Sequence, residues 1–163
     1  MVRLPVLMVN EGRGEVRWLE IESRPGDGRL YLDAHLFFDE RAHGELRLAF
    51  GLLQADRDLL IRDAEPPAGA ATHCLCGPSL GLALYLGMVA ALQDRPVPEG
   101  VFATGVVDQD RKVLAVGGLA EKIRAALERA HRFIVPAGQG LPLAGIEVVE
   151  VSTVEEAVHA CFG

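Results

Sequence analysis

Apolar residues recur in short runs through the first part of the chain, and polar clusters separate these runs. The clusters are rich in glycine, proline, aspartate and asparagine, which is the composition of turns. The runs over residues 3–9, 16–21 and 30–37 therefore predict strands. Two further runs, residues 46–53 and 58–61, fit either another strand or a mixture of strand and helix, and their pattern does not separate the two.

The second part of the chain alternates helices with strands. Residues 79–93 are apolar nearly all round, which is typical of a buried helix. Another helix is predicted from about residue 118 to 131, and a last one begins near Thr153, where Thr153 and Glu156 have capping-box spacing. The remaining apolar runs predict short strands over residues 72–76, 101–107, 113–116, 132–136 and 146–151, the second and third of which form a hairpin. This order indicates an α/β or α+β layered fold.

The length of 163 residues corresponds to a single domain. A loop with two prolines and a glycine, residues 65–71, separates a strand-rich part of about 1–65 from a second part of about 69–163. Because this loop is too short for a domain linker, we expect one compact domain over residues 1–163.

The net charge restricts the classes of binding partner, and the cysteine content indicates the cellular compartment. With 16 Lys and Arg against 23 Asp and Glu, the net charge of −7 disfavours nucleic acids and anionic membranes as partners. The chain has three cysteines, Cys74, Cys76 and Cys161. A small, odd number of cysteines argues against a disulfide framework and indicates a reducing compartment. Neither a signal peptide nor a run of about 18 apolar residues is visible, so we expect a cytoplasmic protein.

The sequence Gly77-Pro78-Ser79-Leu80-Gly81 places a serine where the buried helix begins. One interpretation is structural, because a serine at this position commonly caps the free backbone N–H groups of a helix. The other is catalytic: the flanking glycines let a substrate approach closely, and the free N–H groups of a helix start can stabilise an oxyanion beside a nucleophile.

Only two of the 16 basic residues are lysines, Lys112 and Lys122. Lys122 follows a glycine pair, lies about one turn into the predicted helix and has apolar neighbours. Burial lowers the pKa of a lysine and leaves a neutral amine that can act as a general base. The competing interpretation is a solvent-facing lysine that pairs with Glu121 or Glu128.

These motifs, taken in order, resemble the peptidase domain of the Lon protease family. The resemblance covers roughly residue 69 to the C-terminus and rests on the motif around Ser79, on Thr104-Gly105, and on Gly117-Gly118-Leu119-x-Glu121-Lys122 followed by Ala125-Ala126. Near the end of the chain, Ile134-Val135-Pro136 and residues 151–157 also match. The resemblance implies a dyad in which Ser79 is the nucleophile and Lys122 the general base. Thr104 would orient the lysine amine, and Gly77 would support the nucleophile loop.

The implied activity is hydrolysis of peptide bonds in peptides or unfolded proteins, without a cofactor or metal. The resemblance also implies a homo-oligomer, since such domains commonly form hexameric rings. No Gly-x-x-x-x-Gly-Lys-Ser/Thr phosphate loop occurs in the 163 residues. We therefore expect cleavage that is independent of ATP or that depends on a separate ATPase as unfoldase.

Three positions depart from the family pattern. Cys76 stands where an acidic residue is usual, Leu80 where a small residue is usual, and Val106 where glutamate is common. These changes make the site more apolar, which either lowers the pKa of Lys122 further or marks a site without catalytic demand. The alternative function is therefore a catalytically silent Lon-like domain that serves as an oligomerisation or binding module.

Two other interpretations use the same segment. Gly-x-Ser-x-Gly is also the nucleophile elbow of α/β-hydrolases, for which the candidate partners of the serine would be Asp108 or Asp110 and His131 or His159. That interpretation leaves the lysine motif unexplained. A zinc site would take its ligands from His73, Cys74 and Cys76. Their spacing is too tight for a usual structural zinc site, so buried reduced cysteines are the simpler interpretation.

Overall fold

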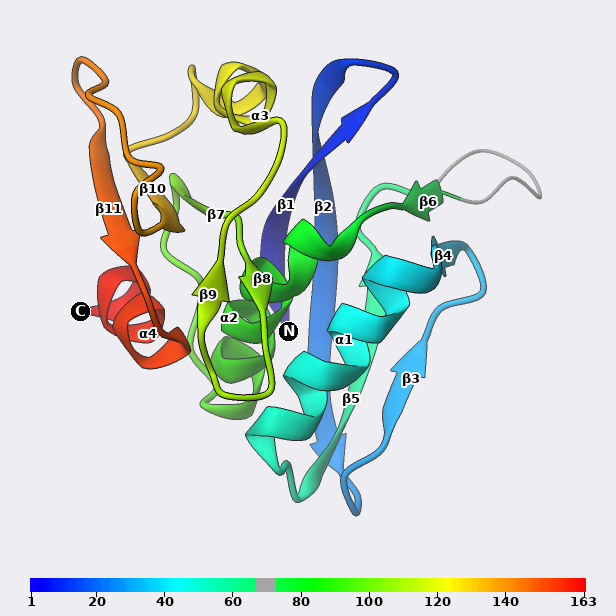
Figure 1. Cartoon of the computed structure of the whole chain (residues 1–163). Helices are drawn as coiled ribbons and strands as arrows, with labels where there is room; N and C mark the ends of the chain where they lie inside the picture. The colour runs from blue at the N-terminus through cyan, green and yellow to red at the C-terminus, as the bar shows by residue number, and fades with distance from the viewer. Residues whose placement is uncertain (67–72) are drawn as a thin grey trace.

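The computed structural model describes residues 1–66 and 73–163 (Figure 1). Helices and strands are layered in an α/β arrangement, which confirms the fold class predicted from the sequence. Of the loop predicted over residues 65–71 the structure describes only Glu65 and Pro66, and Thr72 likewise lies outside the described residues. Within the described ranges, none of the helices combines the length and apolar content that crossing a membrane requires.

The largest sheet is built on a long antiparallel hairpin. Its strands, in spatial order, are β1 (Val2–Asn10), β2 (Arg13–Pro25), β5 (Arg57–Asp63) and β3 (Leu30–Leu32). Glu11 and Gly12 both have positive φ, which is the geometry of a tight two-residue hairpin turn. The strands predicted over residues 3–9 and 16–21 are therefore the two arms of one hairpin, and both arms are longer than predicted.

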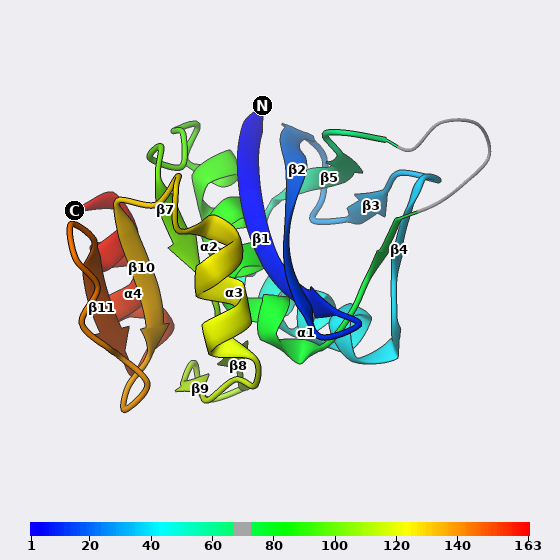
Figure 2. The ribbon, with the colours of Figure 1, turned by 90° about the horizontal axis from the view of Figure 1, so that it is seen from above.

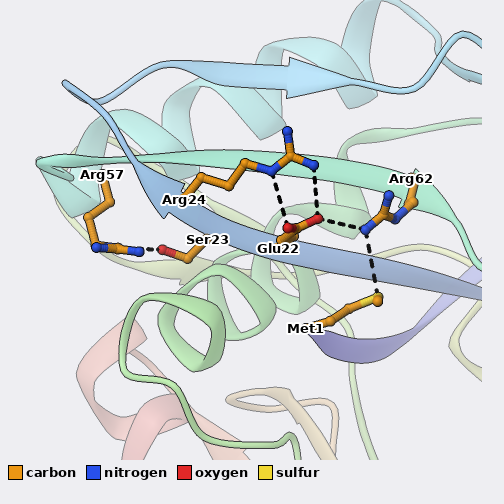
Figure 3. A network of polar contacts seen from close by, with 6 residues as sticks. All are labelled: Met1, Glu22, Ser23, Arg24, Arg57 and Arg62. Atoms are coloured by element: carbon orange, nitrogen blue, oxygen red, sulfur yellow. Dashed lines mark hydrogen bonds and ion pairs between the residues drawn. The ribbon is translucent and has the colours of Figure 1, made fainter.

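A polar network joins β2 to β5 (Figure 3). The carboxylate of Glu22 accepts hydrogen bonds from Arg24 Nε at 3.1 Å and from the Arg62 guanidinium at 2.7 Å. On the next residue, Ser23 Oγ accepts from Arg57 Nε at 2.8 Å. Exposed ion pairs of this kind contribute about 0.2–1 kcal/mol each, so the network supports the pairing of the two strands without dominating it.

Helix α2 (Gly81–Leu92) runs through the middle of the molecule (Figures 1 and 2). It contacts α1 (Glu40–Leu53), α4 (Val154–Phe162) and the β1–β2 hairpin, and residues 81–91 are all buried. A Cβ at Gly87 would lie 2.6 Å from Leu4 Cδ2, so this glycine permits the close approach of helix and sheet. The prediction of a buried helix over residues 79–93 is confirmed.

The structure decides one open prediction for the first part of the chain and corrects another. Residues 46–53 and 58–61 are the mixture of helix and strand that the pattern allowed: the first are the second half of α1, whose first turn Asp39 caps, and the second lie in β5. The strand predicted over residues 30–37 is two strands, β3 and β4 (Leu36–Phe38), because the chain turns at Asp33, whose carbonyl accepts from Leu36 N–H at 3.1 Å. Strand β4 then pairs in parallel with β6 (His73–Leu75).

The hairpin predicted over residues 101–107 and 113–116 is only partly right. Its first arm divides at Thr104-Gly105: β7 (Val101–Ala103) pairs with β10 (Arg132–Pro136), whereas β8 (Val106–Val107) pairs with β9 (Val113–Leu114). Strands β11 (Glu147–Val151), β10 and β7 form a parallel sheet. The division matters for the site, because it turns the backbone of Thr104-Gly105 toward the loop that carries Ser79.

The helix predicted over residues 118–131 is shorter in the structure. Helix α3 spans Leu119–Ala126, because the N–H groups of His131 and Arg132 both donate to the carbonyl of Gly100 and draw the chain into β10. The start of α4 is as predicted: Thr153 Oγ1 accepts from the Glu156 N–H at 3.1 Å.

Candidate active site

Ser79 lies in a single turn of 3-10 helix, Pro78–Leu80, that leads directly into α2. No side-chain hydrogen bond caps this turn or α2, whose cap residues are Gly77 and Leu80. The interpretation of Ser79 as a helix cap is therefore wrong. Its half-buried hydroxyl instead accepts a hydrogen bond from Lys122.

Lys122 projects from the first turn of α3 and is only 3% exposed. Its Nζ lies 2.8 Å from Ser79 Oγ and 3.0 Å from the carbonyl oxygen of Gly117. The solvent-facing interpretation, with Glu121 or Glu128 as partner, is wrong, because the amine points inward. Burial lowers the pKa of Lys122 to about 8. A substantial fraction of the amine is thus neutral in mildly alkaline solution and able to take a proton from the hydroxyl 2.8 Å away.

The β1–β2 hairpin positions the lysine helix (Figure 2). Gly14, at the start of β2, lies so close to α3 that a Cβ there would stand 2.0 Å from the Glu121 carbonyl oxygen. Gly118, directly before α3, has φ +65° and packs against Val9 of β1. The N-terminal strands therefore pack against α3, the helix that carries Lys122.

A side chain far away in the sequence fixes the segment before Lys122. Gln139 Oε1 accepts from the Val116 N–H at 2.8 Å, and Gln139 Nε2 donates to the Val116 carbonyl at 2.9 Å. The amide thus pairs with Val116 as a neighbouring strand would. Since Gly117 follows directly, this pair holds the carbonyl that accepts from Lys122. The sequence pattern gave no signal for Gln139.

Asp39 fixes the loop that carries Ser79. Its carboxylate accepts from the Ala42 N–H at 2.9 Å, which caps α1, and from the Gly77 N–H through both oxygens at 3.2 Å. Gly77 has φ +87°, in the region that favours glycine. Sequence reasoning missed Asp39, although an aspartate three residues before Ala42 is a usual capping signal.

Thr104 and Gly105 meet the nucleophile loop through their backbone. The Gly105 N–H donates to the Ser79 carbonyl at 3.1 Å, and the Gly105 carbonyl accepts from the Leu82 N–H at 3.0 Å. The Thr104 hydroxyl is buried and has no hydrogen-bond partner among the described residues. It therefore makes no bond to the Lys122 amine here, and its orienting role stays a prediction.

The three departures from the family pattern fall in different environments. Leu80 is fully buried in the core, Cys76 is partly buried, and Val106 is half-buried in β8. The neighbouring Val107 N–H donates to Glu45 Oε2 at 3.0 Å. This carboxylate also fills the space beside Gly81, and its burial raises the pKa of Glu45. Glu45 belongs to α1, but its carboxylate lies beside the first residue of α2. Like Asp39, it was missed by the sequence analysis.

The hydrolase and zinc interpretations find no support in the described residues. Asp108 Oδ1 is used in the β8–β9 turn, where it accepts from the N–H groups of Asp110 and Lys112. The hydroxyl of Ser79 meets a lysine rather than a histidine. Among the side chains that the structure describes, no group of three His, Cys, Asp or Glu is placed to hold a metal ion.

Comparison with known proteins agrees with the motifs. The family model for the Lon protease (S16) C-terminal proteolytic domain matches residues 64–156. The chain is 32% identical over 133 residues to the Lon protease of Phenylobacterium zucineum, which covers 76% of this chain and 16% of that protein. It is 30% identical over 168 residues to Lon protease 1 of Sorangium cellulosum, covering 91% of this chain and 20% of that protein.

The chain therefore belongs to the family of Lon protease C-terminal proteolytic domains, as the motifs predicted. It spans 16% of the length of Lon protease 2 of Thermus thermophilus, to which it is 31% identical over 130 residues. The chain thus corresponds to a small part of these relatives.

Proposed function

We propose that the chain is a serine peptidase that hydrolyses peptide bonds in peptides or unfolded proteins. One observation carries the proposal: the buried Lys122 amine lies 2.8 Å from the Ser79 hydroxyl. Family membership supports the same assignment.

In the proposed reaction, Ser79 Oγ attacks the carbonyl carbon of the scissile bond while its proton passes to neutral Lys122 Nζ. The tetrahedral intermediate then collapses, the C–N bond breaks, and the amine leaves with the proton from Nζ. Water next attacks the acyl ester, giving one proton to Nζ, and the ester bond breaks. That proton returns to Ser79 Oγ, which restores the starting state.

Backbone N–H groups at the Ser79 turn would stabilise the oxyanion. The Gly77 N–H already donates to Asp39, so we assign it to holding the loop rather than to the oxyanion. We keep Thr104 as the group that orients the Lys122 amine when Ser79 is acylated and no longer holds it, because its buried hydroxyl has a free lone pair to offer.

The direct experiment is digestion of an unfolded, fluorescently labelled protein without ATP. Wild type is expected to cleave it, whereas Ser79→Ala and Lys122→Ala are expected not to. Ser152→Ala and Lys112→Ala are the matched controls, because both side chains are exposed and outside the site. Cleavage that survives Ser79→Ala and Lys122→Ala would refute the dyad. A wild type that never cleaves would favour a silent binding module.

We further propose that the chain works in the cytoplasm as a homo-oligomer, in line with its family. Light scattering of the purified chain tests the assembly, with a ring of defined subunit number as the expected result. A monomer at all concentrations would count against it. Adding a separate ATPase unfoldase should matter only for folded substrates, since the 163 residues hold no phosphate loop.

A further inference from the structure

Two thiols lie side by side immediately before the nucleophile loop. The Sγ atoms of Cys74, in β6, and of Cys76 are 3.3 Å apart. Cys74 is exposed and Cys76 is partly buried, whereas Cys161 is buried in α4. Cys76 directly precedes Gly77. The proposed dyad uses neither thiol.

We propose that Cys74 and Cys76 are a redox site, which a hydroperoxide oxidises to an intramolecular disulfide that displaces Ser79. Disulfides in reducing compartments are typically transient and redox-sensing. The pair has two features of such a site, because one sulfur is open to solvent and a resolving sulfur lies beside it.

The roles of the two sulfurs follow from their exposure. Burial raises the pKa of Cys76 to about 11, so this thiol stays protonated in neutral solution. The exposed Cys74 therefore attacks first: it gives its proton to solvent, its sulfur takes the terminal OH of the peroxide as the O–O bond breaks, and the departing oxygen takes a proton back from solvent and leaves as water or an alcohol. The product is a sulfenic acid on Cys74.

Cys76 Sγ then attacks the Cys74 sulfur. The S–S bond forms, the S–O bond breaks, and the departing hydroxide takes the Cys76 proton and leaves as water. In sum, two thiols and one hydroperoxide give one disulfide, one water and one water or alcohol. The two sulfurs together lose two electrons, and the peroxide gains them.

The disulfide and the site are coupled through Asp39. The Asp39 backbone N–H donates to the Leu75 carbonyl at 2.9 Å, and its carboxylate holds the Gly77 N–H. These two contacts fix the chain on either side of Cys76. Closing the bond brings the two sulfur atoms from 3.3 Å to about 2.05 Å apart. Since the contacts with Asp39 hold the backbone on both sides of Cys76, we expect this closure to strain at least one of them.

The effect on cleavage rests on the proposed function, but the disulfide itself does not. A shift of about 1 Å in a catalytic group lowers a rate by about 10²-fold. We therefore expect the oxidised chain to cleave unfolded protein about 10²-fold more slowly than the reduced chain, and to recover when a dithiol reductant is added.

The experiment treats the reduced full chain with hydrogen peroxide in the presence of a chelator, then blocks free thiols with iodoacetamide. Mass spectrometry is expected to show one peptide in which Cys74 and Cys76 together lack two hydrogens and carry no alkyl group. The rate should be independent of protein concentration, as for an intramolecular bond. Cys161→Ala is the matched control and should oxidise in the same way as wild type.

Cleavage by Cys74→Ser and by Cys76→Ser should be insensitive to the same peroxide treatment. Oxidation of Cys74 to sulfinic acid while Cys76 still alkylates would overturn the proposal, as would disulfides only between chains. A disulfide that leaves cleavage unchanged would overturn the coupling to Ser79. A reduced chain that neither cleaves nor reacts at Ser79 would refute the proposed function and its coupling, while the mass measurement would still decide the disulfide.

Discussion

The carboxylate of Asp39 accepts the backbone N–H of Gly77 through both oxygens at 3.2 Å, across 38 residues of sequence. The same carboxylate caps α1 by accepting from the Ala42 N–H. One side chain thus sets the start of a helix in the strand-rich part and holds the loop that carries Ser79. The proposed nucleophile depends on residues well outside its own motif.

Substitutions at Asp39 should separate these two tasks. Asp39→Ala is expected to lower the free energy of unfolding by about 0.5–2 kcal/mol through loss of the cap. It should also slow cleavage, because the Gly77 N–H loses its acceptor. Asp39→Ser keeps a capping oxygen but offers one oxygen on a shorter side chain, so stability should largely return while cleavage stays slow. Urea unfolding and peptide cleavage measure the two effects, and full activity of Asp39→Ser would contradict the assignment.

Gly14→Ala, in the β1–β2 hairpin, should displace α3 and so disturb the position of Lys122. The added Cβ would stand 2.0 Å from the Glu121 carbonyl oxygen, which is backbone and cannot rotate away. We expect a loss of about 1–3 kcal/mol in the free energy of unfolding, as overpacked sites show, together with slower cleavage as α3 moves. Gly44→Ala is the matched control: its Cβ meets nothing within 4 Å, so it should stabilise α1 by about 0.5–1 kcal/mol. Equal behaviour of the two variants would refute the close approach of α3.

Gln139→Ala tests the clamp on Val116. Loss of the two hydrogen bonds should let the Gly117 carbonyl shift and slow the chemical step by about tenfold, which corresponds to about 1.4 kcal/mol. Because Gln139 is bonded to Val116 and not to the dyad, KM should stay constant while kcat falls. Gln139→Glu should resemble Gln139→Ala, since a carboxylate can still accept from the Val116 N–H but cannot donate to its carbonyl. A change in KM alone would point to a substrate contact instead.

Periodicity and turn composition could predict the hairpin strands, the buried helix and the cap at Thr153. The pairing of Ser79 with Lys122 was predicted through the resemblance of their motifs to the Lon peptidase domain, since a serine or a lysine near a glycine-rich helix start leaves a structural role equally open. The errors arose where the chain turns without a glycine or proline, as at Asp33 in the strand expected over residues 30–37.

The supporting contacts could not be predicted because they join distant segments. Gln139 lies 23 residues from Val116, and Asp39 lies 38 residues from Gly77. A lone glutamine in a loop carries no periodic signal. The capping role of Asp39 could have been predicted from the sequence, and it would have identified residues 46–53 as helix. Its second hydrogen bond, to the Gly77 N–H, forms only in the folded chain.

Burial of Lys122 should lower the free energy of unfolding, and the size of this effect should depend on pH. The pKa of Lys122 is about 8 in the folded chain and about 10.4 when unfolded. Between these values the unfolded state binds more protons, so stability rises with pH. At a pH of about 7, Lys122→Met should be about 1–3 kcal/mol more stable than wild type, allowing for lost hydrogen bonds.

Urea unfolding of wild type and Lys122→Met across this range is the corresponding measurement. The advantage of the variant should shrink as the pH rises from about 8 to about 10.4. Lys112→Met, at an exposed position, should show no such convergence. An advantage that stays constant with pH would mean that the Lys122 amine is not desolvated in the folded chain.

The pH dependence of Ser79 modification by a fluorophosphonate tests the dyad most directly, because it needs neither substrate specificity nor turnover. The labelling rate should rise with pH and then level off, with the midpoint of the rise at a pH of about 8, as Lys122 loses its proton. Lys122→Arg should label only at the background rate, since arginine keeps its proton, and Lys112→Arg should label as wild type does. A rate that is flat with pH, or a Lys122→Arg variant that labels as fast as wild type, would contradict the role of Lys122 as general base.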